Sequence, residues 1–156
     1  MGNMSAPSLV GIAMVVGLLA WVSYTGINKY IECTEIQGDP KYDNRKMYLS
    51  HVLTIGITFA ATLILRPVLD LMTGPWRSAA PPFFIISGIA GLISSIFSYQ
   101  IISDEKCEKD EQKHKISMGS VIAGIIVSCI AIIIGFSMFM YNADSRRYYG
   151  NYFGGY

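Results

Sequence analysis

The sequence has little charge, few cysteines and few histidines, and each shortage excludes a class of protein. Charged residues make up 15% of its 156 residues, against about 25% in ordinary soluble domains. Three cysteines are too few for a disulfide-rich scaffold, and no Cys-x-x-Cys pair suggests a zinc site. His51 and His114 stand apart from other metal ligands, so we expect no metal site and no cofactor. A net charge of +1 gives no sign of nucleic-acid binding.

Recognisable catalytic motifs are also absent from the sequence. It contains no nucleophile elbow, no P-loop and no dinucleotide-binding fingerprint. No long apolar segment has a charged residue at its centre, where ion-coupled transporters and proton pumps usually need one. We therefore expect a protein that is not an enzyme, while a passive pore formed by several copies stays open.

The longest apolar segment is 116–141, which reads ISMGSVIAGIIVSCIAIIIGFSMFMY and contains no charged residue. A bilayer core about 30 Å thick needs about 20 apolar residues in helical form, and a lone segment in lipid can pair its backbone groups only as a helix. Three other segments resemble it. The sequence therefore predicts four membrane-spanning helices, at 8–27, 47–72, 82–102 and 116–141.

We expect these spans to form one all-α membrane domain, residues 1–156, folded as a compact four-helix bundle. Ser23 and Ser98 are 75 positions apart, and Cys33 and Cys107 are 74 apart, so the chain can also be read as two tandem helical hairpins. The predicted connections are two charged loops and a Gly- and Pro-rich turn, at 28–46, 103–115 and 73–82.

Small residues recur every four positions in two of the predicted spans. Lipid tails are as apolar as leucine, so spans are held together by close backbone approach at small residues rather than by hydrophobicity. Gly91 and Ser95 in 82–102, with Gly124 and Ser128 in 116–141, are therefore the predicted helix-packing residues. Cys129 is predicted to be a further small packing residue.

Cys33 and Cys107 lie in the two charged loops, which four spans would place on the same side of the membrane. These loops together hold eight Lys and Arg, and this count favours a cytoplasmic position for them, with both termini in the lumen or outside. A disulfide between the two cysteines would require an oxidising compartment instead. The two signals conflict, so the sequence leaves both the orientation and the pairing open.

Arg66 and Asp70 are the only Lys, Arg, Asp or Glu residues within the predicted spans, at the end of 47–72. They are four positions apart, so on a helix they share a face and can pair. We interpret them as an interfacial ion pair in which the arginine reaches toward the headgroups. The alternative is a buried pair that contacts a partner subunit.

The C-terminal tail, 142–156, reads NADSRRYYGNYFGGY and combines aromatic rings with a flexible, glycine-bearing backbone. Tyrosine offers a large contact area with a polar group, which suits protein interfaces. The predicted partner-docking residues are Arg146, Arg147, Tyr148, Tyr149, Tyr152, Phe153 and Tyr156. The alternatives are a tail that lies on the membrane surface and a disordered tail.

This layout resembles small four-span proteins that are structural parts of larger membrane assemblies, which is a likeness of architecture alone. Such proteins include accessory subunits of organelle complexes, membrane proteins of large membrane-containing viruses, and tetraspan scaffold proteins. The resemblance implies a non-catalytic, multi-pass anchor or scaffold subunit in an organelle or viral membrane. Its partners would be lipids and other protein subunits, bound through the tail and the small-residue helix faces, and not nucleic acid. The alternative function is a small channel or transporter that acts as an oligomer.

Overall fold

The computed structural model describes residues 6–64, 76–107 and 111–153, with side chains described over 11–61, 80–107 and 114–141. These ranges contain four long helices and a short 3-10 helix, and no β-strand, as the predicted all-α fold requires. The helices are α1 (Ala6–Glu32), η1 (Thr34–Ile36), α2 (Pro40–Ile64), α4 (Trp76–Ile102) and α5 (Glu111–Phe153).

Three of the helices are long and apolar enough to cross a membrane. The candidate spans are Gly11–Glu32 in α1, Ala80–Ile102 in α4 and His114–Tyr141 in α5. Within its described part, α2 does not reach this length of apolar helix, because its first two turns carry four charged residues. The rest of the predicted span 47–72, from residue 65 onward, lies outside the described residues. This part contains Arg66 and Asp70.

The helices extend further into the charged segments than the sequence analysis expected. The predicted loop 28–46 is wrong in extent, because α1 runs to Glu32 and α2 begins at Pro40. Proline is well placed at a first helical position, where its missing N–H would have no partner in any case. Asp39 caps the same helix, since its Oδ1 accepts a hydrogen bond of 2.9 Å from the backbone N–H of Lys41.

The second half of the chain shows the same extension. The predicted connection 73–82 is helical from Trp76 onward, although Pro81 and Pro82 lie inside α4. They are the sixth and seventh residues of the helix, beyond the N–H groups that have no intrahelical partner, so each removes one hydrogen bond from its second turn. In the same way, α5 continues past the predicted span as far as Phe153, so most of the tail that we expected to be flexible is helical.

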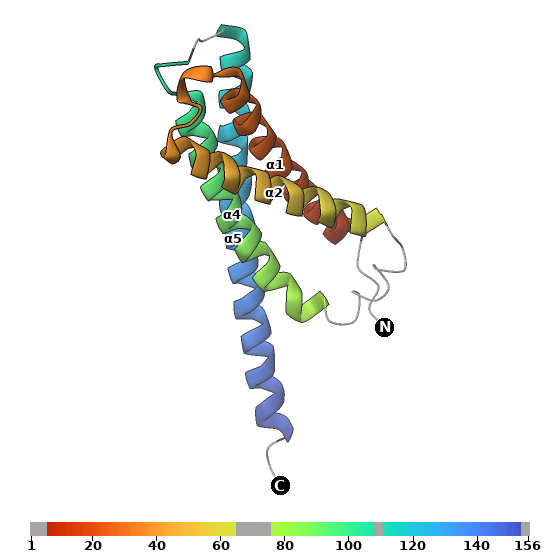
Figure 1. The fold of residues 1–156 in the computed structure, drawn as a ribbon. Coiled ribbons are helices and arrows are strands. Elements are labelled where there is room, and N and C mark those ends of the chain that lie inside the picture. The colour runs from red at the N-terminus through yellow and green to blue at the C-terminus, as the bar shows by residue number, and fades with distance from the viewer. Residues whose placement is uncertain (1–5, 65–75, 108–110, 154–156) are drawn as a thin grey trace.

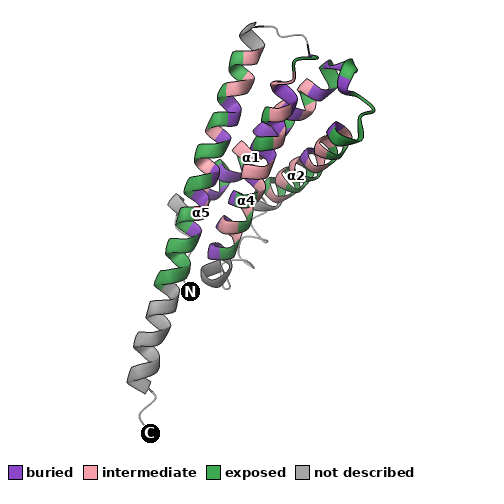
Figure 2. Cartoon of the chain, turned by 90° about the vertical axis from the view of Figure 1, so that its left-hand side faces the viewer, coloured by how far each residue is buried: buried purple, intermediate pink, exposed green. Residues whose placement is uncertain are grey.

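The molecule is built from two hairpins, α1 with α2 and α4 with α5, which meet at the end that holds the two interhelical loops (Figure 1). α1 packs against all three other long helices, and α4 packs most extensively against α5. Toward the other end the two hairpins diverge, and α5 reaches well beyond the rest of the molecule. Figure 2 shows that buried residues line the inner faces of the hairpins, while exposed residues cover the outer side of α5.

The predicted packing residues lie together where α4 and α5 meet α1. Ser95 and Ser128 are buried, and a Cβ atom added to Gly91 would lie 2.2 Å from the Ser128 Oγ. A Cβ added to Gly124 would lie 2.7 Å from the Ser95 Oγ. These helices therefore approach one another at a distance that larger residues at the two glycines would prevent.

Two further glycines, Gly88 and Gly135, lie against backbone atoms of the facing helix, and neither is among the four predicted helix-packing residues. A Cβ on Gly88 would lie 2.8 Å from the Ser128 carbonyl oxygen, and one on Gly135 would lie 2.9 Å from the Pro81 carbonyl oxygen. A backbone atom cannot rotate away as a side chain can. These two positions therefore set the separation of α4 and α5 at two levels.

We expect Gly88→Ala to lower the melting temperature of the protein in detergent, because the added methyl group presses on the backbone of α5. Overpacking of this kind costs about 1–3 kcal/mol. Gly119→Ala in α5 is the control, since a Cβ there meets nothing within 4 Å. The control should be neutral or stabilising, because alanine is the better helix former by about 1 kcal/mol. Equal melting temperatures for the two variants would refute the close contact.

Candidate functional site at the polar end

The four long helices converge around the loops 33–39 and 103–107, and we call this region, residues 28–46, 102–107 and 111–117, the polar end (Figure 1). It carries most of the charged residues of the chain, while the helices that lead into it are largely apolar. Three kinds of contact bring its segments together, namely a disulfide, tyrosine–carboxylate hydrogen bonds and cation–π contacts.

The disulfide joins Cys33, directly after α1, to Cys107, in the loop after α4. The Cα atoms are 5.4 Å apart, and both side chains are buried in a cluster with Tyr30, Ile36 and Tyr42. Sequence analysis identified these two cysteines as a possible pair but could not decide between pairing and free thiols. The structure brings them together, and the bond connects the first hairpin to the second.

Two tyrosine–aspartate hydrogen bonds flank the disulfide, and sequence analysis did not find them. The Tyr30 hydroxyl donates to the Asp43 carboxylate, which ties α1 to α2. The Tyr42 hydroxyl donates to the Asp104 carboxylate, which ties α2 to the loop after α4. Asp104, in the predicted charged loop 103–115, therefore lies against the buried Tyr42 ring of α2.

Cations cover the outer faces of the same two rings. The Lys46 Nζ lies 5.3 Å from the centroid of the Tyr30 ring, and the Arg45 guanidinium lies 5.2 Å from that of Tyr42. A cation within about 6 Å of a ring centroid is attracted by the negative face of the ring. Charges of both signs therefore make contacts within the polar end.

The Tyr42–Asp104 pair shifts the titration of both groups. The hydrogen bond from Tyr42 lowers the pKa of the Asp104 carboxyl, and the backbone N–H of Lys106, 3.0 Å from Asp104 Oδ1, lowers it further. The same hydrogen bond, with desolvation of the ring, raises the pKa of the Tyr42 hydroxyl. Tyr42 thus remains a protonated donor and Asp104 an ionised acceptor over the neutral range.

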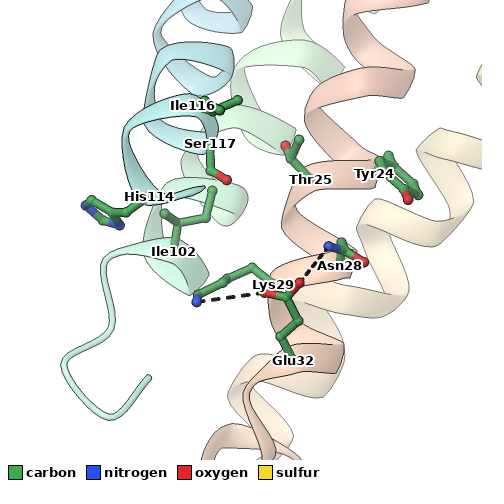
Figure 3. Close-up of a pocket in the computed structure, with 9 residues that line it drawn as sticks. All are labelled: Tyr24, Thr25, Asn28, Lys29, Glu32, Ile102, His114, Ile116 and Ser117. Carbon is green, nitrogen blue, oxygen red and sulfur yellow. Dashed lines mark hydrogen bonds and ion pairs between the residues drawn. The ribbon is translucent and has the colours of Figure 1, made fainter. Parts of the chain in front are cut away.

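A cavity of about 320 Å³ lies beside this cluster, between the end of α1, the end of α4 and the start of α5 (Figure 3). Glu32 organises one wall, since it accepts a hydrogen bond of 3.1 Å from Asn28 Nδ2 and its Oε2 lies 4.0 Å from Lys29 Nζ. The lining residues are Tyr24, Thr25, Asn28, Lys29, Glu32, Ile102, His114, Ile116 and Ser117. They come from three helices, so no local sequence motif marks the cavity.

The remaining residues singled out in the sequence are dispersed. His51 is exposed on α2, while His114 lines the cavity at the start of α5. Cys129 is a free, exposed thiol, so its prediction as a packing residue is wrong. It follows the buried Ser128 in α5, and successive helical positions are turned by about 100°, which takes Cys129 out of the contact.

The predicted docking tail is described only in its backbone. Arg146, Arg147, Tyr148, Tyr149, Tyr152 and Phe153 all lie on the last turns of α5, and Tyr156 lies outside the described residues. Over the described ranges, no group of three or more His, Cys, Asp or Glu side chains is placed to hold a metal ion.

Comparison with known proteins assigns the chain to a family. The chain belongs to the family described as a domain of unknown function (DUF5904), whose sequence model matches residues 2–143. The matched region includes both loops of the polar end, the disulfide and the three candidate spans. No curated protein matches the chain, and no solved structure matches it.

We expect the Cys33–Cys107 bond to form in the cell and to stabilise the two-hairpin arrangement. On non-reducing gels, protein from thiol-blocked membranes should migrate differently before and after reduction, and Cys33→Ser should remove this difference. Closing a loop of this length stabilises a protein by about 2–4 kcal/mol, so reduction should also lower the melting temperature in detergent. Cys129→Ser is the control and should behave as wild type. A wild-type chain that migrates identically with and without reductant would contradict the bond.

The lowered pKa of Asp104 predicts an acid-sensitive contact. Since the folded value lies below the unfolded value of about 3.9, ionised Asp104 stabilises the fold above that pH, and the contribution is lost as pH falls through the folded value. Between about pH 5 and pH 2.5 the melting temperature of wild type should therefore fall more steeply than that of Asp104→Asn. Glu105→Gln, at the exposed neighbouring position, should keep the wild-type slope. Equal slopes for wild type and Asp104→Asn would show that the carboxylate contributes nothing.

Proposed function

We propose that this protein is a four-span membrane protein that acts as a non-catalytic anchor or scaffold subunit of a larger membrane assembly. The observation that carries the proposal is α5, which contains the candidate span His114–Tyr141 and then continues as helix to Phe153, beyond the other helices (Figure 1). A helix of this form combines membrane insertion with an arm that is available to another subunit.

The distribution of side chains supports membrane insertion. The buried polar positions of α1, α4 and α5 are serines, whereas large aliphatic residues such as Ile86 and Ile133 are 66% and 64% exposed. In water this arrangement would expose extensive apolar patches, which soluble monomers rarely carry. In lipid it is the expected arrangement, because small and hydroxyl residues hold helices together while aliphatic residues face the acyl chains.

The fourth span is proposed from the position of α2. Its apolar part begins at Met47 and runs beside α1, and the Phe59 ring stacks on Phe83 of α4 at a centroid distance of 5.2 Å. A membrane that surrounds α1 and α4 would therefore also surround this part of α2. Ile55 and Ile57 are both exposed, as lipid contact requires.

The orientation is proposed from the disulfide. A bond between Cys33 and Cys107 forms and persists in an oxidising compartment, so the polar end would face that compartment and both termini the opposite one. This is the reverse of the orientation favoured by the count of basic residues. The preference of basic loops for the cytoplasm is a statistical rule, and nine acidic residues occupy the same two predicted loops.

The scaffold role is proposed from the end of α5. Residues 142–153 extend the helix by about 18 Å at 1.5 Å per residue. The helical repeat places position 152 one turn after 148, and position 153 one turn after 149. All four positions are aromatic in the sequence, which suits a helix that docks onto a partner protein.

A pore within a single chain gains no support from the helix contacts. The cavity between α1, α4 and α5 that is lined by Gly91, Ser95, Gly124 and Ser128 holds only about 10 Å³, roughly the least that a single water needs. The alternative of a channel or transporter would thus require several copies of the chain. Flux of small ions into liposomes that contain the purified protein measures this alternative.

Deletion of Tyr148–Tyr156 should leave membrane insertion intact and reduce incorporation into the assembly, because the docking arm is removed while the spans remain. Resistance to alkaline carbonate extraction measures insertion, and native mass spectrometry after mild detergent extraction measures the assembly. Deletion of Gly154 and Gly155 alone, which keeps every aromatic residue of the tail, is the control and should assemble nearly normally. If the chain without Tyr148–Tyr156 assembles at wild-type levels, the docking role is wrong.

A further inference from the structure

The cavity at the polar end lies at the level where three candidate spans end. Glu32, Ile102 and His114 line it, and they are the terminal residues of the candidate spans in α1, α4 and α5 on this side of the molecule. In a chain inserted as proposed above, the cavity is therefore at the depth of the lipid headgroups.

The lining changes character across the cavity. Figure 3 shows Asn28, Lys29 and Glu32 together on the last turns of α1, while Tyr24 and Ile116 lie on the side toward the membrane-spanning parts of the helices. A cavity with one polar and one apolar wall suits an amphipathic ligand. Its volume of about 320 Å³ lies at the lower end of the range for small-molecule sites.

The polar wall offers groups for both a cation and an anion. Glu32 supplies a carboxylate, and Lys29 supplies an ammonium group whose Nζ lies 4.0 Å from Glu32 Oε2. The Nδ1 atom of His114 is buried and has no hydrogen-bond partner within the described part of the chain. A ligand that carries a single negative charge would meet Glu32 unfavourably, whereas a zwitterionic ligand can satisfy both signs.

The lining of the cavity also distinguishes between the possible cationic groups of a ligand. Quaternary ammonium groups are typically held by several aromatic faces, and Tyr24 supplies the only phenol or indole ring among the residues that line the cavity. A primary ammonium instead needs hydrogen-bond acceptors, and a carboxylate is a strong one. The cavity therefore favours a primary ammonium.

We propose that this cavity binds a zwitterionic phospholipid with a primary ammonium group, that is, one with a phosphoethanolamine headgroup. Glu32 accepts hydrogen bonds from the ammonium, Lys29 and His114 contact the phosphate, and the acyl chains leave past Ile116 into the bilayer. The inference rests on the proposed membrane insertion and adds a ligand class to it.

The test is native mass spectrometry of the full chain in detergent with added phosphatidylethanolamine, phosphatidylcholine or phosphatidylglycerol of identical acyl chains. Wild type should bind phosphatidylethanolamine about tenfold more tightly than the other two lipids, the worth of one charge-assisted contact. Glu32→Gln should abolish this preference. Glu35→Gln, at an exposed position of η1, is the matched control and should retain it.

Lys29→Met is a second variant for which a different change in lipid binding is expected, because Lys29 is proposed to contact the phosphate and all three lipids carry a phosphate. It should weaken the binding of phosphatidylethanolamine and phosphatidylcholine by a similar factor. Melting temperatures near the wild-type value show that the variants are folded, and if Glu32→Gln unfolds, the Lys29→Met result decides. Equal binding of the three lipids to wild type, or a preference that survives in Glu32→Gln, would overturn the proposal.

Two further measurements distinguish binding of the whole lipid from binding of its headgroup alone, and failure of the lipid site from failure of the membrane proposal. Soluble O-phosphoethanolamine should bind much more weakly than the lipid, and equally tight binding would overturn the lipid assignment, because the acyl chains would then contribute nothing. Carbonate extraction tests the membrane proposal independently. A chain that stays inserted but shows no headgroup preference overturns the lipid site alone, whereas a chain released by carbonate overturns the insertion on which it rests.

Discussion

The close approach of α4 to α5 and α1 at glycine and serine positions is the contact on which the other features depend. Gly88 and Gly135 bring α4 and α5 together on backbone atoms, and Gly91 and Gly124 admit the side chains of Ser128, Ser95 and Val22. Because small residues occupy these contacts, many large aliphatic residues of the same helices, such as Ile86 and Ile133, are left on the outside. A single packing rule thus accounts both for the fit of the helices and for their apolar outer surface.

At the polar end the same helices are held by bonds of a different kind. The Cys33–Cys107 disulfide and the Tyr42–Asp104 hydrogen bond connect segments that are 74 and 62 positions apart in sequence. The Tyr30–Asp43 hydrogen bond and the cations over both rings add contacts between α1 and α2 and within α2. These contacts need water or protein partners around charged groups, so they lie where the candidate spans end. The cavity proposed as a lipid site lies at this boundary, where apolar packing gives way to charged contacts.

The two ends of the molecule would then have different tasks. The polar end is cross-linked by the Cys33–Cys107 disulfide and carries a cavity of about 320 Å³ between three helices. The opposite end diverges, and from it α5 continues as a single helix to Phe153 (Figure 1). The anchor role proposed above assigns lipid binding to the first of these ends and partner docking to the second.

The sequence by itself determined the helical class, three of the long apolar segments and the small residues of the α4–α5 contact, because composition and periodicity are local properties of the chain. It left the pairing of Cys33 and Cys107 open, and it misplaced Cys129 and the limits of the loop 28–46. Only the tertiary structure decided the cysteine pairing, the tyrosine–aspartate contacts and the cavity. Each of these joins residues from different helices or from the loops that follow them, and which residues meet depends on how the helices are rotated and tilted against one another. That geometry follows from contacts summed over whole helix faces, so no single stretch of the sequence contains it.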